Sequence, residues 1–380
     1  MLAREFRANP AYDLVLFDRL SPQERRALAE LAAEPGFYGV LRPCGGRGPA
    51  LRSVDRDTAL LFLTLREPGP LPSYVRSALG EAAERTVARL VADGVLEVAD
   101  GGAFVSGAAA VSLLRPCGEE TGSGRLAALS LAALRHAQAL PGDDPLRLTW
   151  SLYAYNRRPL TPRWQRLLPS SEAVEAHLKI ALGGANRARL DRSWSRSSSS
   201  DWLSWSARRR AGLGSAATRV TYKLYVSPLP EALAEGFAAV LDAITAARAA
   251  QFKVGSNALG LLRSDKIVAY FNRFERLAEA AETVRRHLDG APAQGVPFTS
   301  EIGGDGLLSW GVDPPRTTWA ASEGTSWRFW LARRLAAALL VARSAAGEGV
   351  EPHRFALERL RLEGVDTTTW TPGALLWRED

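Results

Sequence analysis

The stretch of sequence that decides the fold is Arg219-Val-Thr-Tyr-Lys-Leu-Tyr-Val-Ser227. Side chains along a β-strand point alternately to the two faces of its sheet. One face of the predicted strand is apolar and aromatic, and it consists of Val220, Tyr222, Leu224 and Val226. The other face is polar, and it consists of Thr221, Lys223, Tyr225 and Ser227. We therefore expect a strand with one apolar and one polar face.

The segments that follow this strand predict an α+β domain. Pro228 and Pro230 end the strand. After them come a predicted amphipathic helix over 231–250, a strand over 251–254, a strand over 266–271 and a helix over 274–288. This order of elements is typical of a mixed or antiparallel sheet that is flanked by helices.

The residues before this domain predict a smaller one, and we place the two domains at 1–120 and 121–380. Three helical patterns occur over 55–65, 70–80 and 81–93, and a hairpin pattern over 95–105 follows Gly94. This order indicates a winged-helix-like domain that binds nucleic acid, a peptide or a partner. The segment 81–89 carries two acidic residues against two arginines, which favours peptide or protein contact over DNA.

Composition excludes several classes of protein. The chain has 380 residues, a formal net charge of +7, 46% hydrophobic residues and 23% charged residues, as an ordinary globular protein has. We find no secretory signal, no apolar segment of membrane-spanning length, no phosphate-binding loop and no dinucleotide fingerprint. Four histidines lack metal-ligand spacing. We therefore expect a cytoplasmic protein without a cofactor or a metal.

Lysine is rare in this chain, which makes its positions informative. Only four of the 48 basic residues are lysine, and one of them is Lys179. The other three, Lys223, Lys253 and Lys266, each lie on a different predicted strand. Lysine can lose its proton when its pKa is lowered, whereas arginine cannot. The alternative is that each lysine protects a strand edge from aggregation.

Lysines and tyrosines on one side of neighbouring strands predict a cationic, partly buried pocket. Several cations together bind a dianion such as phosphate. They also lower the pKa of the lysine that is most buried and most crowded by like charge. Such a lysine is a candidate general base near neutral pH.

Three motifs, in their order and spacing, resemble the HopA family of type III effectors. The motifs are Tyr222-Lys-Leu-Tyr-Val-Ser227, Phe252-Lys-Val-Gly255 and Arg263-Ser-Asp-Lys-Ile-Val-Ala-Tyr-Phe271. Relatives of this family occur in actinobacterial clusters for ribosomally made peptides, including class V lanthipeptides and thioamitides. The order is also similar, more distantly, to OspF-type phosphothreonine lyases and the lyase domains of lanthipeptide synthetases. The resemblance covers residues 150–340 and is poor or absent before residue 120.

The resemblance implies β-elimination of phosphate from phosphoserine or phosphothreonine in a peptide. Lys253 matches the position that supplies the base, and Lys223 matches the lysine that grips the phosphate and polarises the substrate. Tyr225 stands where the OspF-type pattern has histidine, which puts a histidine general acid in doubt. The phenol of Tyr225 can donate a proton, so Tyr225 is a catalytic candidate together with Lys253 and Lys223. Lys266 and Arg263 are candidates for phosphate binding, and Tyr270 for orienting the substrate or the base.

Two further segments are candidate walls of the site. The predicted irregular loops over 298–302, 308–316 and 325–328 carry Arg316 and Arg328 as candidate phosphate contacts. Ser309 and Thr299 are candidates for positioning the substrate. The serine-rich segment 193–206 holds three tryptophans, so it is either a surface loop held down by its indoles or a flap over a peptide-binding cleft.

These inferences converge on a carbon–oxygen lyase without metal or cofactor. Its substrate is a phosphorylated precursor peptide, and a separate kinase-like protein installs the phosphate because this chain shows no nucleotide site. We expect neither a nucleic-acid nor a membrane partner. Three alternatives remain: a non-catalytic peptide-binding subunit that activates a kinase, a winged-helix DNA-binding regulator, and an effector that acts on host phosphoproteins.

Overall fold

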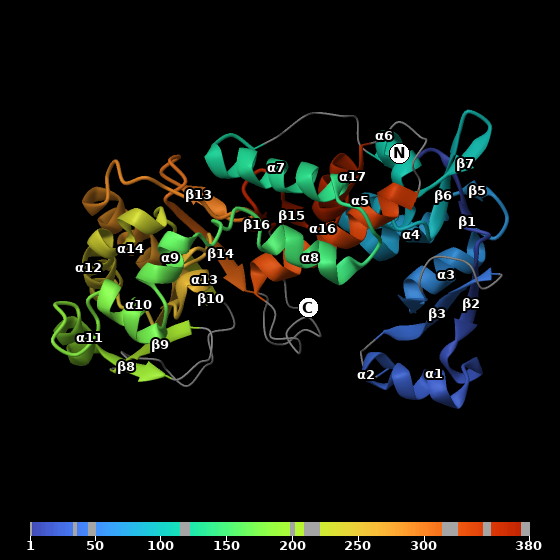
Figure 1. Ribbon diagram of the computed structural model, residues 1–380. Coiled ribbons are helices and arrows are strands. Elements are labelled where there is room, and N and C mark those ends of the chain that lie inside the picture. Colours follow the sequence, from blue (N-terminus) through green and yellow to red (C-terminus); the bar gives the residue numbers. More distant parts are fainter. Residues whose placement is uncertain are drawn as a thin grey trace. The chain divides into compact units, whose positions relative to one another are not determined.

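A computed structural model describes residues 2–32, 36–44, 51–114, 122–197, 202–208, 221–313, 326–344 and 351–373. The chain forms two compact units (Figure 1). Unit 1 comprises Met1–Gly118 and Ala338–Glu363, and unit 2 comprises Glu119–Ala337 and Gly364–Asp380. A C-terminal segment thus belongs to the N-terminal unit, which no sequence pattern indicated. Separate functions for residues 1–120 and 121–380 stay a prediction.

Unit 1 contains the predicted helices and hairpin. The helices are α3 (Arg56–Thr64), α4 (Ser73–Leu79) and α5 (Ala83–Ala92), and the hairpin is β6 (Leu96–Asp100) with β7 (Ala103–Val105). Strands β1 (Glu5–Ala8) and β5 (Gly69–Pro70) extend the hairpin into a sheet of order β5-β1-β6-β7. The winged-helix assignment and its binding role stay predictions.

Further elements of unit 1 were not predicted from the sequence. Strands β2 (Tyr12–Leu16), β3 (Phe37–Pro43) and β4 (Arg52–Asp55) form a second antiparallel sheet. Short helices are α1 (Pro22–Ala27), α2 (Ala29–Ala32) and α6 (Val111–Leu114). Helix α17 (Pro352–Leu362) packs on α5, and Arg359 Nε lies 2.6 Å from Asp93 Oδ1.

Unit 2 is built on a seven-stranded antiparallel sheet of order β13-β14-β10-β12-β11-β9-β8. The strands are β8 (Trp194–Ser197), β9 (Trp202–Ala207), β10 (Thr221–Val226), β11 (Gln251–Gly255), β12 (Ile267–Phe271), β13 (Ser300–Ile302) and β14 (Leu308–Asp313). The predicted α+β class is confirmed, and every strand pairing is antiparallel.

Unit 2 also contains helices, several of which pack on this sheet (Figure 1). They are α7 (Arg125–Ala139), α8 (Pro145–Tyr153), α9 (Pro162–Leu167), α10 (Ser171–His177), α11 (Arg187–Ser193), α12 (Pro230–Ala246), α13 (Ala258–Leu261), α14 (Phe274–His287) and α16 (Trp327–Ser344), the last of which continues into unit 1. A small hairpin joins β15 (Val365–Asp366) to β16 (Thr371–Pro372). Among the described residues, no helix combines the length and apolarity needed to cross a membrane.

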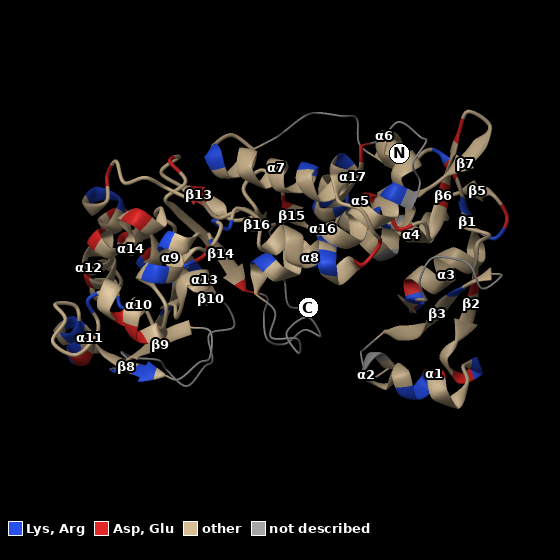
Figure 2. Ribbon diagram, in the orientation of Figure 1, with Lys and Arg blue, Asp and Glu red and all other residues tan. Residues whose placement is uncertain are grey.

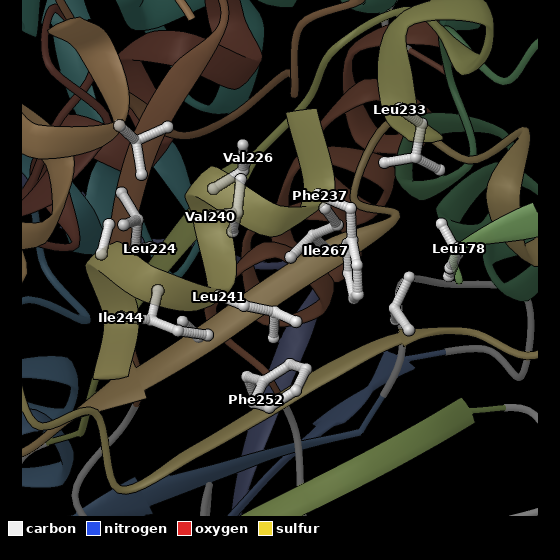
Figure 3. Close-up of a cluster of buried hydrophobic side chains, with 14 of the residues drawn as sticks. Leu178, Leu224, Val226, Leu233, Phe237, Val240, Leu241, Ile244, Phe252 and Ile267 are labelled. Atoms are coloured by element: carbon white, nitrogen blue, oxygen red, sulfur yellow. The ribbon is translucent and has the colours of Figure 1, made fainter. Parts of the chain in front are cut away.

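The apolar face of the sheet packs on α12 and α14 and forms the core of unit 2 (Figure 3). Its strand residues include Leu224, Val226, Phe252 and Ile267, and its helix residues include Phe237, Val240, Leu241 and Ile244. Complete burial of one such side chain stabilises the fold by about 1.5–3 kcal/mol. The predicted apolar face of β10 is therefore confirmed, and its polar face is left for other contacts.

The tryptophan-rich segment extends the sheet, instead of forming an irregular loop. Strands β8 and β9 pair with each other, and β9 pairs with β11. The Trp205 ring stacks on Phe252 with centroids 4.8 Å apart, and Trp194 meets the same ring edge-on, also at 4.8 Å. These two indoles belong to the core, whereas Trp202 alternates to the polar face. The tip of this hairpin, residues 198–201, lies outside the described residues.

The predicted irregular loops after residue 298 need correction. Residues 300–302 and 308–313 form β13 and β14, and β14 pairs with β10 along its whole length. Trp327 and Arg328 begin helix α16. The strands escaped prediction because β13 is short and the glycines in and around β14 are typical of turns. Arg316 lies outside the described residues.

Candidate active site

The polar face of the sheet brings together lysines and tyrosines from three adjacent strands. Paired residues of an antiparallel sheet lie on the same face. Lys223 of β10 pairs with Tyr270 of β12, and Lys253 of β11 pairs with Val268, which also pairs with Tyr225. The Nζ atoms of Lys223 and Lys253 lie 5.3 and 5.9 Å from the centroid of the Tyr270 ring. The predicted convergence of Lys223, Lys253 and Tyr270 is therefore present.

Lys253 carries the most exceptional amine of the site. Its Nζ lies 4.1 Å from the centroid of the Trp202 ring, and no described residue accepts a hydrogen bond from it. Burial lowers the pKa of Lys253 to about 8, and the like charge of Lys223 acts in the same direction. A substantial fraction of this amine is therefore neutral just above pH 7, as a general base requires.

Lys223 forms an ion pair in this structure. Its Nζ lies 2.6 Å from Oδ2 of Asp313, and its side chain is only 8% exposed. The other carboxylate oxygen of Asp313 accepts a hydrogen bond from the backbone N–H of Trp327 at the start of α16. Asp313 therefore fixes Lys223 on the polar face, at the end of β14.

A second carboxylate, Asp265, holds the two arginines of the site. Arg263 donates from Nε and Nη2 to both oxygens of Asp265, at 2.7 and 3.0 Å, and Arg328 donates from Nη1 at 2.9 Å. Burial alone would raise the pKa of the Asp265 carboxyl, but Arg328 and Arg263 hold it well below its usual range. Asp265 is therefore ionised at any working pH of the protein.

The two arginines differ in the hydrogen-bond donors that remain available to a ligand. Arg328 is 1% exposed, and its other donors reach the backbone carbonyls of Pro297 and Tyr153, at 3.1 and 3.0 Å. Arg263 is partly exposed, its guanidinium lies 5.0 Å from the centroid of the Trp202 ring, and its Nη1 donates to no described residue. Phosphate binding by either arginine stays a prediction, and the contacts favour Arg263.

Lys266 is completely buried beside the sheet. Its Nζ donates to the carbonyl of Pro228 at 2.8 Å and to Oε1 of Gln294 at 2.7 Å. Burial lowers the pKa of Lys266 to about 7, because neither partner offers a full negative charge. Its proposed phosphate contact stays a prediction, and the ammonium is occupied by two neutral oxygens in this structure.

The remaining candidates lie on or behind the same face. Burial raises the pKa of both Tyr225 and Tyr270 above the usual range of a phenol. Ser309 pairs with Tyr225 across β14 and is 1% exposed. Thr299 is as buried, and its hydroxyl donates to the carbonyl of Val296 at 2.6 Å. The positioning roles of Ser309, Thr299 and Tyr270 stay predictions.

Sequence reasoning missed Asp265, Tyr153 and Asp313 as residues of this site, and it placed Trp202 only within a candidate flap. Asp265 stands between Arg263 and Lys266 in the third motif, so a carboxylate among cations was a usable signal. Trp202 was detectable by alternation, because it lies two residues before Ser204 and therefore on the polar face of its strand. The others, Tyr153 and Asp313, come from distant segments and had no local signal; the Tyr153 hydroxyl lies 3.3 Å from Asp265 Oδ2.

The charges of the two units are mixed, with acidic and basic residues on each (Figure 2). Helix α5, which covers most of the segment 81–89, also mixes acidic and basic residues, and its Arg89 lies one turn after Arg85 and Glu84. Among the described residues, no group of three histidine, cysteine, aspartate or glutamate side chains is placed to hold a metal ion. The lysines and arginines on and beside the polar face of the sheet in unit 2 are therefore the feature that a proposed function has to explain.

No protein-family model and no curated protein matches the chain. Solved structures with partial likeness include an effector protein from Pseudomonas syringae pv. tomato, at 12% identity, 64% coverage of this chain and 96% of that chain, with a TM-score of 0.38. The phosphothreonine lyase effector VirA (SpvC) of Chromobacterium violaceum matches at 11% identity, 31% and 65% coverage, and a TM-score of 0.25. The phosphothreonine lyase SpvC from Salmonella matches at 8% identity, 55% and 97% coverage, and a TM-score of 0.26. Such low scores assign neither a reaction nor a substrate to this chain.

Proposed function

We propose that the chain is a lyase that eliminates phosphate from phosphoserine or phosphothreonine in a peptide. The observation that carries the proposal is the amine of Lys253. It lies among cations, has a pKa of about 8, and donates no hydrogen bond to a described residue. A neutral amine beside a cluster that attracts phosphate is what removal of a proton next to a phosphorylated carbon requires.

The elimination uses the site as follows. Lys253 Nζ takes the proton from Cα of the phosphorylated residue. The electron pair of that C–H bond forms the Cα–Cβ double bond while the bond from Cβ to the phosphate oxygen breaks. The phosphate leaves with that bonding pair, and dehydroalanine or dehydrobutyrine remains in the peptide. The Cα proton is weakly acidic, so a cation near the peptide carbonyl is needed to stabilise the developing oxyanion.

Cations, more than a phenol, stabilise the leaving group in this proposal. Burial raises the pKa of Tyr225, the residue at the position of the family's histidine, so it holds its proton firmly. Lys223 forms an ion pair on the polar face, and Arg263 lies over the same Trp202 ring as Lys253. Phosphate is already a fair leaving group, so neutralising its charge matters more than protonating it.

The resemblance of the three motifs to the HopA family extends the proposal to a biological role. We infer that the substrate is the precursor of a ribosomally made peptide, as in lanthipeptide or thioamitide maturation. A separate kinase-like protein would supply the phosphate. Unit 1 would then bind the leader segment of the precursor or the kinase.

Variants of Lys253 test the proposed reaction. We expect Lys253→Ala and Lys253→Arg to bind a synthetic phosphothreonine peptide but to lose elimination by roughly 10²–10⁴-fold, because neither side chain offers a neutral amine. Lys179→Arg is the matched control, since Lys179 is exposed and outside the cationic cluster. Full activity in Lys253→Arg would exclude Lys253 as the base.

The same experiment addresses the leading alternative. A peptide-binding subunit that only activates a kinase would bind the phosphopeptide and leave its mass unchanged. In that case the wild type and the Lys253 variants would behave alike in the mass measurement. A difference in mass between the wild-type and Lys253→Ala reactions therefore excludes the alternative.

A further inference from the structure

The loop after helix α8 lies beside Arg263. The backbone N–H of Arg158 donates to the carbonyl of Leu262 at 2.9 Å, so the backbone after Arg157 is joined to the backbone before Arg263. The side chain of Asn156 donates to the carbonyls of Gln294 and Gly295 at 2.8 and 3.0 Å. This loop is therefore tied to two segments of unit 2 at once.

Buried polar contacts fix the conformation of this loop. Asn156 has a φ of 66°, in the left-handed region that asparagine tolerates better than most residues. Gln294 Nε2 donates to the carbonyl of Asn156 at 2.6 Å, and Gln294 Oε1 accepts from the buried Lys266. Lys266 and Gln294 thus hold the backbone that carries Arg157.

Arg157 is a cation without a described partner. Its side chain is exposed, and no described residue forms an ion pair or a side-chain hydrogen bond with it. Partial burial lowers the pKa of Arg157, and the charge of Arg263 acts in the same direction. The charge of Asp265 acts in the opposite direction, but this carboxylate already pairs with Arg263 and Arg328, so it does not compensate Arg157 as well.

The site as a whole also carries more positive than negative charges. Among the described residues, the cations of the site are Lys223, Lys253, Arg263, Arg328 and Arg157, and the carboxylates near them are Asp265 and Asp313. When Lys253 is the neutral base, at least two positive charges remain uncompensated, and Lys266 adds to them when it is protonated. A phosphate monoester carries about that charge of opposite sign near neutral pH.

We propose that Arg157 binds the phosphate group of the phosphorylated residue, together with the free Nη1 of Arg263. The inference rests on the proposed function and adds a phosphate ligand from a segment outside the three motifs. A guanidinium suits this task because its planar donors bind phosphate oxygens in pairs. Lys266 and Gln294 fix the backbone of the loop, so the position from which the Arg157 side chain extends is set before substrate arrives.

Arg157→Ala tests the inference, and Arg158→Ala is the matched control from the next position. The probes are inorganic phosphate, followed by titration calorimetry, and a synthetic phosphothreonine peptide, followed by steady-state kinetics. We expect Arg157→Ala to weaken phosphate binding and raise KM on the order of 10–100-fold, as loss of a charge-assisted hydrogen bond does. Arg157→Lys should recover part of this loss, and Arg158→Ala should match the wild type.

The outcomes separate this inference from the proposed function. Phosphate binding that depends on Arg157 in a protein that eliminates nothing would contradict the lyase but support the anion site. Equal phosphate affinity and equal KM in Arg157→Ala and Arg158→Ala would overturn the inference, even if the protein is an active lyase. Circular dichroism of each variant shows whether the fold is retained.

Discussion

The Nζ atom of Lys253 lies 4.1 Å from the centroid of the Trp202 ring. Lys253 belongs to strand β11, and Trp202 belongs to the adjacent strand β9. The indole removes water from one side of the amine, and burial is the main reason that its pKa falls to about 8. Arg263 lies over the same ring at 5.0 Å. Trp202 thus connects the candidate base to a candidate phosphate ligand.

The rate of elimination should rise with pH through the pKa of Lys253. The protonated amine cannot accept a proton, so kcat should increase between pH 7 and 9 with a midpoint near 8. A pH–rate profile with saturating phosphothreonine peptide measures this midpoint. A rate that is constant from pH 6 to 9 would show that no amine of this pKa limits the reaction.

Trp202→Ala should move this midpoint to higher pH. Without the indole, water reaches the amine, and the pKa of Lys253 returns toward 10.5. The loss of the ring's attraction for the cation acts in the opposite direction, but burial is the larger cause. Activity at pH 7 should therefore fall more than activity at pH 10. An unchanged midpoint would contradict burial by Trp202 as the cause.

Asp313→Asn should move the midpoint the other way. The carboxylate of Asp313 favours the charged form of Lys253, so removing its charge lowers the pKa of that amine. The variant also removes the partner of Lys223 in a 2.6 Å ion pair, so the positive charge of Lys223 near Lys253 is no longer compensated. The pH–rate profile of this variant should shift to lower pH. A shift to higher pH would exclude this electrostatic coupling.

Asp265→Asn should destabilise unit 2 strongly. The substitution leaves Arg328 and Arg263 without their shared carboxylate, and Arg328 is buried. Breaking a buried ion pair in this way costs about 3–5 kcal/mol. Asp242→Asn removes the partner of Arg189 in an exposed pair and should cost less than about 1 kcal/mol. Urea unfolding compares the two, and equal losses would contradict a structural role for Asp265.

Lys266→Met should change how stability depends on pH. The pKa of Lys266 is about 7 in the folded protein and 10.5 in the unfolded chain, so between these values the unfolded state binds more protons. The free energy of unfolding of the wild type, relative to the variant, should therefore rise between pH 7 and 10. The slope is at most about 1.4 kcal/mol per pH unit. A difference that is constant with pH would show that Lys266 is not buried as a low-pKa lysine.

The parts of the fold that the sequence predicts are those with local periodicity. The alternation in β10 and the helical patterns of α12 and α14 are confirmed, because each strand or helix carries its own apolar face. Strand β14 was missed because the glycines in it and before it are typical of turns, and its pairing with the distant β10 leaves no local signal to outweigh them. Local sequence does not record such a pairing.

The residues of the candidate site likewise fall into those that local alternation predicts and those that depend on distant contacts. Alternation placed Lys223, Lys253 and Tyr270 on one face, which the register confirms. It could not distinguish the amine of Lys253 from that of Lys266, because the partner of Lys266 is Gln294 in a distant loop. Burial and ion pairing depend on contacts of this kind, so the sequence alone does not predict them.

The mass of a phosphothreonine peptide after incubation with the protein tests the central claim most directly. Deuterium at Cα of the phosphothreonine makes the test specific to proton removal. The account predicts a product that has lost phosphoric acid together with the Cα deuterium, in the wild type and not in Lys253→Ala. A product that has exchanged phosphate for water and kept the deuterium would identify a phosphatase and contradict the account.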